Sequence, residues 1–162
     1  MSVKDLKKHS VVLIHGRFDK DFFNGLAKRG AGRVFVLEGR PDFATAKHAA
    51  KELLKRKIRP VIVSDNMAGF LFFREYVKEV WVSCLTSDKD GFMCAVGSLI
   101  LAVLGKKHKV PVRAVQGDGE SRLMGDPREL CYFNGVEVAP PGTKAYVPLA
   151  DWVDRKYISK VI

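Results

Sequence analysis

The sequence predicts an α/β fold with three layers, in which helices cover both faces of a mainly parallel sheet. Short apolar runs alternate along the chain with segments of helical periodicity, which is the pattern of repeated βα units. The runs are apolar at successive positions, as expected of strands that are buried on both faces. The 162 residues, of which 47% are hydrophobic, suffice for one core. We therefore expect a single Rossmann-like domain over residues 1–162.

Five strands are expected from apolar runs that end in polar or turn-forming residues. They are expected at residues 11–14, 34–37, 61–63, 80–82 and 111–115. A sixth apolar stretch lies in the tail, where residues 133–138 and 145–147 flank Pro140, Pro141 and Gly142 and are expected to form a hairpin. Each of the first four strands leads into a segment of helical periodicity, so the connections fit parallel pairing.

The helices are expected at about residues 21–28, 41–56, 67–76 and 91–107, with a short one near 154–159. Gly30 and Gly32 are typical of the end of the first helix. In the second helix, Ala46, Ala49 and Leu53 fall opposite a row of lysines, as expected of a helix that covers a sheet. Residues 116–127 are polar and rich in glycine, which indicates a lid or another loop.

The chain is basic, with 28 Lys and Arg against 18 Asp and Glu and a net charge of +10. This charge permits attraction to phosphates, nucleic acid or an acidic protein. The basic residues are dispersed, and the aromatic residues fall mostly in the expected core. We interpret the lysines as a solvated surface and expect no direct contact with nucleic acid, because nucleic-acid sites usually add exposed aromatic side chains.

The sequence offers no pattern of a metal or cofactor site. Cys84, Cys94 and Cys131 lack paired spacing, as do the four histidines, so we expect buried free thiols and no metal. The Gly-x-Gly pairs at residues 30–32 and 117–119 do not complete a nucleotide fingerprint, and we expect no cofactor. The longest uncharged run, residues 91–105, is too short to span a membrane, and we expect a cytoplasmic protein without membrane contact.

Polar side chains follow the first three expected strands. They are His15 and Arg17, then Glu38 and Arg40, then Asp65 and Asn66. Because the carboxyl ends of parallel strands meet at one edge of a sheet, we expect these six residues to surround one ligand-binding opening, together with the loop 84–90.

Structural roles are open for some of these side chains. Asp65 and Asn66 are also common N-cap residues. Glu38 and Arg40 can pair with neighbouring groups, which would satisfy their charges. Arg17 has no evident partner in the sequence, so a phosphate or carboxylate ligand is its expected use.

Several motifs resemble a known family in order and spacing. They are Val-Leu-Glu-Gly-Arg-Pro at residues 36–41, Ser-Asp-Asn-Met-Ala at 64–68, Val-Gly-Ser at 96–98, Leu-Ala-Val-Leu at 101–104, Asn-Gly-Val-Glu-Val-Ala-Pro at 134–140 and Pro-Leu-Ala-Asp at 148–151. The chain resembles the carboxyl-terminal domain shared by the alpha, beta and delta subunits of initiation factor 2B, methylthioribose-1-phosphate isomerase and ribose-1,5-bisphosphate isomerase. The resemblance covers roughly residues 10–162. Residues 1–10 form a residual segment where the family has an amino-terminal helical domain.

Two departures from the isomerases bear on activity. The resemblance places a catalytic cysteine after the first strand, where this chain has Gly16 after His15. It places an acid–base aspartate in a Gly-Ala-Asp-Arg turn after the fourth strand, where this chain reads Ser-Cys-Leu-Thr at residues 83–86. Glycine and leucine cannot transfer the protons that an isomerisation needs.

The resemblance therefore implies a non-catalytic domain related to initiation factor 2B, with a role in translation initiation. We expect it to bind a phosphorylated metabolite, either a phosphosugar or a nucleotide, or a protein partner at the carboxyl edge of the sheet. The alternative is a divergent aldose–ketose sugar-phosphate isomerase that uses His15, Asp65 and either Asp88 or Asp90. Family usage and the apolar tail at residues 146–152 lead us to expect a homodimer.

Overall fold

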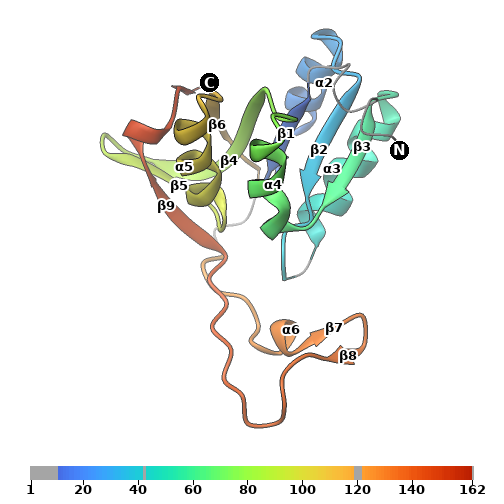
Figure 1. The fold of residues 1–162 in the computed structure, drawn as a ribbon, viewed down its shortest axis with the longest axis vertical. Helices are drawn as coiled ribbons and strands as arrows, with labels where there is room; N and C mark the ends of the chain where they lie inside the picture. Colours follow the sequence, from blue (N-terminus) through green and yellow to red (C-terminus); the bar gives the residue numbers. More distant parts are fainter. Residues whose placement is uncertain (1–10, 42, 119–121, 162) are drawn as a thin grey trace.

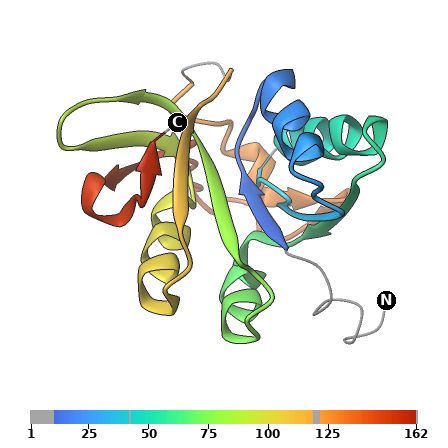
Figure 2. The same ribbon diagram turned by 90° about the horizontal axis from the view of Figure 1, so that it is seen from above.

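The computed structural model describes residues 11–41, 43–118 and 122–161, and it has three layers (Figures 1 and 2). The main sheet has α2 and α3 on one face and α4 and α5 on the other. Its parallel strands lie in the order β10-β6-β4-β1-β2-β3, and β5 and β9 add antiparallel pairing next to β4. The predicted three-layer α/β/α fold is thus confirmed.

The strands are β1 (Val12–His15), β2 (Arg33–Leu37), β3 (Arg59–Val63), β4 (Glu79–Ser87), β5 (Gly91–Ala95), β6 (Val112–Gln116), β9 (Ala150–Asp154) and β10 (Lys160–Val161). The helices are α2 (Lys20–Lys28), α3 (Ala44–Lys55), α4 (Ala68–Phe73) and α5 (Ser98–His108).

Apolar side chains on both faces of the central strands form two cores. Leu13 belongs to the core under α4 and α5, together with Phe72 and Leu101. Its neighbour Ile14 points to the other face and packs with Phe23 and Leu53 beneath α2 and α3. Alternate side chains of β1 thus reach both cores, which explains why residues 12–14 are all apolar.

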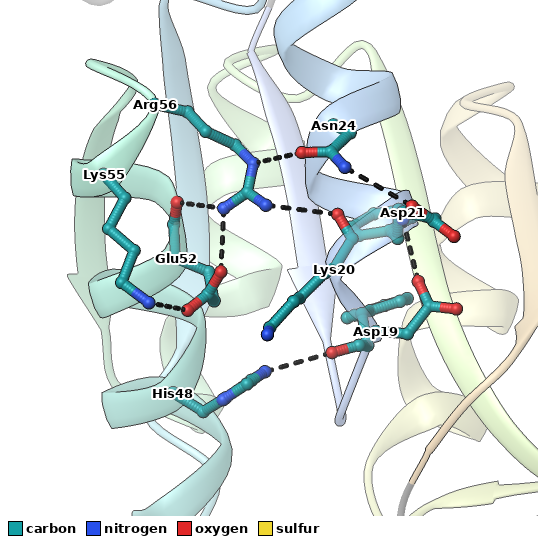
Figure 3. Close-up of polar contacts among 10 residues, drawn as sticks. Asp19, Lys20, Asp21, Asn24, His48, Glu52, Lys55 and Arg56 are labelled. Carbon is teal, nitrogen blue, oxygen red and sulfur yellow. Dashed lines mark hydrogen bonds and ion pairs between the residues drawn. The ribbon is translucent and has the colours of Figure 1, made fainter.

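A polar network fixes α2 against α3 (Figure 3). The guanidinium of Arg56 donates hydrogen bonds to Asn24 Oδ1 at 2.8 Å and to the Lys20 carbonyl at 3.3 Å, which both come from α2. Arg56 and Lys55 also contact the carboxylate of Glu52, at 2.8 and 2.6 Å. The hydrogen bond from Lys55 and then that from Arg56 lower the pKa of Glu52 to about 2. The network holds the start of α2, and with it the turn that carries Arg17.

The segment expected to be one helix over residues 91–107 is instead a strand followed by a helix. Phe92 and Cys94 are fully buried while Met93 and Ala95 are half-buried, which is the alternation of a strand. Gly97 has φ of +97°, a conformation that favours glycine, and it separates β5 from α5. The helix prediction was wrong for residues 91–95 because this short apolar stretch fits both periodicities.

Residues 122–149 form an arm that extends beyond the carboxyl ends of the parallel strands (Figure 1). It contains α6 (Arg128–Cys131) and a small hairpin of β7 (Tyr132–Phe133) and β8 (Val136–Glu137). Asn134 and Gly135 form the turn with φ of +52° and +76°, as an Asn-Gly pair does in a two-residue hairpin loop.

The tail differs from the expected hairpin and helix. Residues 145–147 do not pair with 133–138, and β9 instead joins β5 in the main sheet. The expected helix at 154–159 is a single 3-10 turn, η2 (Arg155–Tyr157), which leads into β10. Within the described ranges, no helix has the length and apolar character needed to cross a membrane.

Candidate functional site

A cavity of about 370 Å³ lies at the carboxyl edge of the sheet, between the strand ends and the arm. Three of the six predicted residues line it: His15, Arg17 and Arg40. The other lining residues come from the β2–α3 turn and the start of α3, from β4 and β5, and from the segment after β6: Gly39, Pro41, Ala44, Thr45, Ser83, Leu85, Ala95, Val96, Asp118, Arg122 and Leu149. A cavity thus lies at the edge where the opening was expected, with a partly different lining, and ligand binding there stays a prediction.

The turn after β1 is packed tightly against β4. The Arg17 backbone N–H donates to Ser83 Oγ at 2.9 Å. Gly16, which precedes Arg17, has φ of +98°, and a Cβ atom on it would overlap Ser83 Oγ. The position that the resemblance matches to a catalytic cysteine therefore has neither the conformation nor the space that a side chain needs.

His15 forms part of the cavity wall and is only 4% exposed. Its Nε2 lies 2.7 Å from the Val96 carbonyl, so this nitrogen carries the proton and donates it to the oxygen. Nδ1 is buried and has no hydrogen-bond partner among the described residues. A Cβ atom on Gly97 would come within 3.3 Å of Nε2, so the start of α5 presses closely against the imidazole.

Asp151 of β9 caps α5 from outside the helix. Its Oδ2 accepts hydrogen bonds from the Gly97 N–H at 2.9 Å and the Leu99 N–H at 3.3 Å. Burial raises the pKa of Asp151, whereas these two bonds and the nearby His15 oppose the rise. The carboxylate thus ties β9 to the helix that starts beside the cavity.

Arg17 was expected to lack a partner, and that expectation was wrong. Its Nε lies 3.1 Å from Asp118 Oδ1, and both side chains are nearly half exposed. Asp118 is 101 positions away in the sequence and approaches only because β6 lies beside β4 in the sheet. An exposed pair of this kind is worth about 1 kcal/mol or less, so an anionic ligand can compete for the guanidinium.

Arg40 lies at the cavity between two aromatic rings. Its guanidinium carbon is 4.9 Å from the ring centroid of Phe133 in the arm and 5.5 Å from that of Phe43. These cation–π contacts join the arm to the β2–α3 turn. In the described structure the Arg40 guanidinium thus contacts aromatic rings, and it does not depend on an ion pair with the neighbouring Glu38.

Asp65 is close to the site but does not line the cavity. Its Oδ1 accepts the Gly39 N–H at 3.0 Å and its Oδ2 accepts the Arg40 N–H at 2.9 Å. Both oxygens are thus engaged in holding the β2–α3 turn. Asp65 is a positioning residue. It lies inside η1 (Asp65–Met67), whose N-cap is Ser64, so it does not take the N-cap role that the sequence also allowed.

Three further candidates do not line the cavity. Glu38 is half-buried, and Asn66 is exposed on η1. Asp88 lies at the tip of the β4–β5 hairpin, where its Oδ1 accepts the N–H groups of Asp90 and Gly91. The expectation that residues 84–90 surround the opening was wrong because β4 continues to Ser87, and of this segment only Leu85 reaches the cavity.

Two buried cysteines lie opposite each other on β4 and β5. Cys84 and Cys94 are in direct register, and Cys84 Sγ lies 3.0 Å from the Val115 carbonyl. The hydrogen bond between the two thiols lowers the pKa of Cys84 and raises that of Cys94. Both are free thiols. Throughout the described ranges, no three His, Cys, Asp or Glu side chains gather as metal ligands would.

The sequence interpretation missed Ser83, Asp118 and Arg122. Ser83 was placed next to the expected loop but received no role, although it lies within β4 and lines the cavity. Asp118 and Arg122 lie in the glycine-rich segment 116–127, and only the suggestion of a lid there pointed to them.

Comparisons with known proteins agree with the fold and the motifs. The chain is 33% identical over 141 residues to a methylthioribose-1-phosphate isomerase of Thermus thermophilus, covering 80% of this chain and 43% of that protein. It is 33% identical over 151 residues to the enzyme of the same name from Desulforudis audaxviator, covering 84% of this chain and 43% of that protein. The matched region thus spans less than half the length of these curated relatives.

Two solved structures share the fold. The 5-methylthioribose 1-phosphate isomerase of Pyrococcus horikoshii superposes with a TM-score of 0.82 at 21% identity, covering 95% of this chain and 49% of that one. The delta subunit of translation initiation factor eIF-2B from A. fulgidus superposes with a TM-score of 0.81 at 20% identity, covering 94% and 51%. The family model described as "Initiation factor 2 subunit family" matches residues 2–162. This chain therefore belongs to the initiation factor 2 subunit family.

Proposed function

We propose that this domain binds a phosphorylated metabolite in the carboxyl-edge cavity and does not isomerise it. The observation that carries the proposal is the charge of the lining, where three arginines face one described carboxylate, Asp118. Guanidinium groups suit phosphate because their donors match its oxygens. The cavity of about 370 Å³ falls in the size range of small-molecule sites.

The absence of catalysis is supported by the groups that surround the cavity. Gly16, in the turn beside the cavity, and Leu85, which lines it, stand where the resemblance places a cysteine and an aspartate, and neither side chain can move a proton. Of the residues considered for an enzyme, Asp65 binds backbone N–H groups with both oxygens, and Asp88 and Asp90 lie on the hairpin tip. Among the four, His15 alone lines the cavity.

The second candidate is a divergent sugar-phosphate isomerase. It is favoured by the relatives, which are named methylthioribose-1-phosphate isomerases. In this chain it would depend on His15, whose buried Nδ1 has no hydrogen-bond partner among the described residues.

A ligand screen with a turnover assay separates the two candidates. Thermal unfolding is measured with methylthioribose 1-phosphate, ribose 1,5-bisphosphate, a nucleotide or inorganic phosphate, since a ligand that binds only the folded state raises the melting temperature. We expect a shift with at least one organic phosphate and none with equimolar inorganic phosphate. Arg122→Ala should reduce the shift, whereas Arg128→Ala, an exposed arginine of the same arm that does not line the cavity, should not. Turnover of either sugar phosphate at about 1 s⁻¹ or faster would replace this proposal with the isomerase.

A second copy of the chain is the proposed partner. The apolar tail at residues 146–152 gives less support for a homodimer than expected, because Val147 is buried and Ala150–Asp154 form β9. The support comes from another surface, which we call the α4–α5 face. Its large apolar side chains are exposed, with Phe73 at 73% and Ile100 at 63%, and comprise Met67, Phe70, Phe73, Leu99, Ile100 and Val103. Exposed apolar patches of this kind mark interfaces, and a two-fold contact pairs such a patch with itself.

A place in translation initiation and in the cytoplasm is part of the same proposal. It rests on the family and on the naming of a structural neighbour as a translation initiation factor. Retention of the purified domain by an initiation complex, lost in a variant of the α4–α5 face or of Arg122, would test it.

A further inference from the structure

The edge of the sheet opposite the cavity carries the excess positive charge of the protein. We define the amino edge as the residues that end each covering helix and begin the next parallel strand, which are 28–34, 52–60, 74–80, 106–113 and 156–161. These segments contain fifteen Lys and Arg against three Glu, whereas the remaining described residues contain ten against twelve Asp and Glu. The charge that is dispersed along the sequence is thus gathered on one side of the fold, away from the arm (Figure 1).

Part of this charge is used within the structure. Glu79 pairs with Arg29 at 2.7 Å and Arg113 at 3.1 Å, and Glu52 pairs with Lys55 and Arg56. Nine other exposed Lys and Arg side chains of the amino edge, among them Lys78, Lys106 and Lys160, form no ion pair with a described residue. A helix C-terminus favours basic residues, but this preference does not extend to the starts of strands, where Arg59, Lys78 and Lys160 lie.

The basic side chains converge most closely around the end of α5. A hollow of about 290 Å³ there is lined by Lys106, Lys109, Lys156 and Tyr157. The ammonium groups of Lys106 and Lys156 each lie 5.1 Å from the centroid of the Tyr157 ring. Three ammonium groups around one hollow would attract a phosphate group, although Lys156 is already paired with Asp154.

The extent of the amino edge identifies the kind of anion. Basic residues lie at the starts of β10, β6, β4, β2 and β3, so they span a six-strand row of the sheet. At a spacing of about 4.8 Å between strands, this row is roughly 24 Å wide. A single small anion covers one point of such a row, whereas a duplex nucleic acid places phosphates along all of it, about seven base pairs at 3.4 Å each.

The aromatic residues favour a duplex over a single strand. Single-stranded nucleic acid is usually held by bases stacked on exposed aromatic rings. At the amino edge Tyr76 is buried, and Tyr157 is half-buried with Lys106 and Lys156 over its ring. We propose that the amino edge binds the phosphate backbone of double-stranded nucleic acid, without reading its sequence, through Lys78, Lys106, Lys107 and Lys160.

The test measures binding of the full chain to a fluorescein-labelled duplex of about 24 base pairs by anisotropy, at salt concentrations from about 50 to 200 mM. We expect a dissociation constant on the order of 10⁻⁵ M that rises steeply with salt. The edge variant Lys106→Ala, Lys107→Ala, Lys160→Ala should weaken binding by about tenfold or more and reduce the salt slope by about 2 to 3. The control variant Lys47→Ala, Lys51→Ala, Lys144→Ala removes the same charge from exposed positions outside the amino edge and should bind as the unmodified chain does.

Melting curves first establish that both variants are folded. If the edge variant is not, Lys78→Ala alone takes its place, with an expected reduction of the slope by about 1. Absence of binding at the lowest salt, or an equal loss in the control variant, would overturn the proposal. Competition by polyglutamate as effective as competition by unlabelled duplex would also overturn it, in favour of an acidic protein partner.

Discussion

Asp65 is bound to Arg40 through the main chain and not through the guanidinium. One carboxylate oxygen accepts the Arg40 N–H at 2.9 Å and the other accepts the Gly39 N–H at 3.0 Å. The guanidinium of Arg40 instead contacts the aromatic rings of Phe43 and Phe133, and the residue lines the cavity. Asp65, in the turn after β3, thus fixes the backbone from which Arg40, in the turn after β2, reaches the cavity.

Replacing Asp65 should cost stability as well as binding. Asp65→Ala removes two charge-assisted acceptors and leaves two half-buried N–H groups without a partner, which we expect to lower the free energy of unfolding by about 2–4 kcal/mol. The neighbouring Asn66→Ala, on an exposed side chain, should change it by about 0.5 kcal/mol or less. Urea unfolding of both variants measures the difference. Equal stability of the two would contradict the positioning role of Asp65.

A cysteine introduced at residue 16 should lower the stability of the domain instead of simply creating an active site. Gly16→Cys places a side chain at φ of +98° and against Ser83 Oγ, so we expect a loss of about 1–3 kcal/mol of stability. Adding Ser83→Ala removes the overlapping oxygen and should recover part of the loss. A double-mutant cycle by thermal unfolding measures this coupling, and purely additive effects would show that the two positions do not interact.

We expect no isomerase activity from the double variant Gly16→Cys, Leu85→Asp. The reason is geometric, because the new thiol would lie against Ser83 and not in the open part of the cavity. The measurement is conversion of methylthioribose 1-phosphate by the purified double variant, with the unmodified chain alongside. Conversion by the double variant at about 1 s⁻¹ would show that residue 16 can serve the chemistry.

Acid should weaken the attachment of α2 to α3 through Glu52. The pKa of this carboxyl is lowered in the folded chain from 4.5 to about 2, so the unfolded chain binds more protons between these values. Its contribution is therefore fully present above pH 4.5 and is lost as the pH falls towards 2. Denaturant unfolding at pH 7 and pH 3 should show a smaller decrease for Glu52→Gln than for the unmodified chain. The same decrease in both would assign the acid sensitivity to other groups.

Association should depend on the α4–α5 face. Light scattering should give twice the chain mass of 18.1 kDa, and Phe73→Asp should return the monomer because a charge would be buried in an apolar contact. Tyr146→Asp introduces the same charge at a side chain that is 76% exposed in the arm and serves as the control. A monomer at all concentrations would rule out the second copy as the partner.

The sequence predicted the parallel part of the fold because its strands are apolar on both faces and alternate with helices. It failed at residues 91–95, where Phe92 and Cys94 fit a strand and a helix equally well. The pairing with β9 decides between them, and Val153, the partner of Phe92, is 61 positions away. The carboxyl-edge cavity was predictable from strand ends alone. The partner of Arg17 was not, since Asp118 reaches it only through the order of strands in the sheet.

The gathering of basic residues at the amino edge could not be predicted from the sequence for the same reason. Lys57 and Lys107 belong to separate groups in the sequence, and dispersal was the ground for interpreting them as a general solvated surface. Each group ends a covering helix, and all such helices in this fold end at the same side of the sheet. Counting the basic residues at the end of each predicted helix, instead of in windows along the sequence, would have found the amino edge.

Gly97 limits how this domain can diverge. A methyl group there would press on the imidazole of His15, and the positive φ already disfavours other residues. The same residue donates its N–H to Asp151 and precedes the first turn of α5. A substitution at residue 97 would thus disturb three features together: the cavity wall at His15, the start of α5 and the contact of α5 with β9. Compensating changes would be needed at all three places at once. Saturation mutagenesis scored by solubility should leave glycine nearly alone at this position, while Gly135 on the exposed hairpin turn, which also has a positive φ, should still accept asparagine.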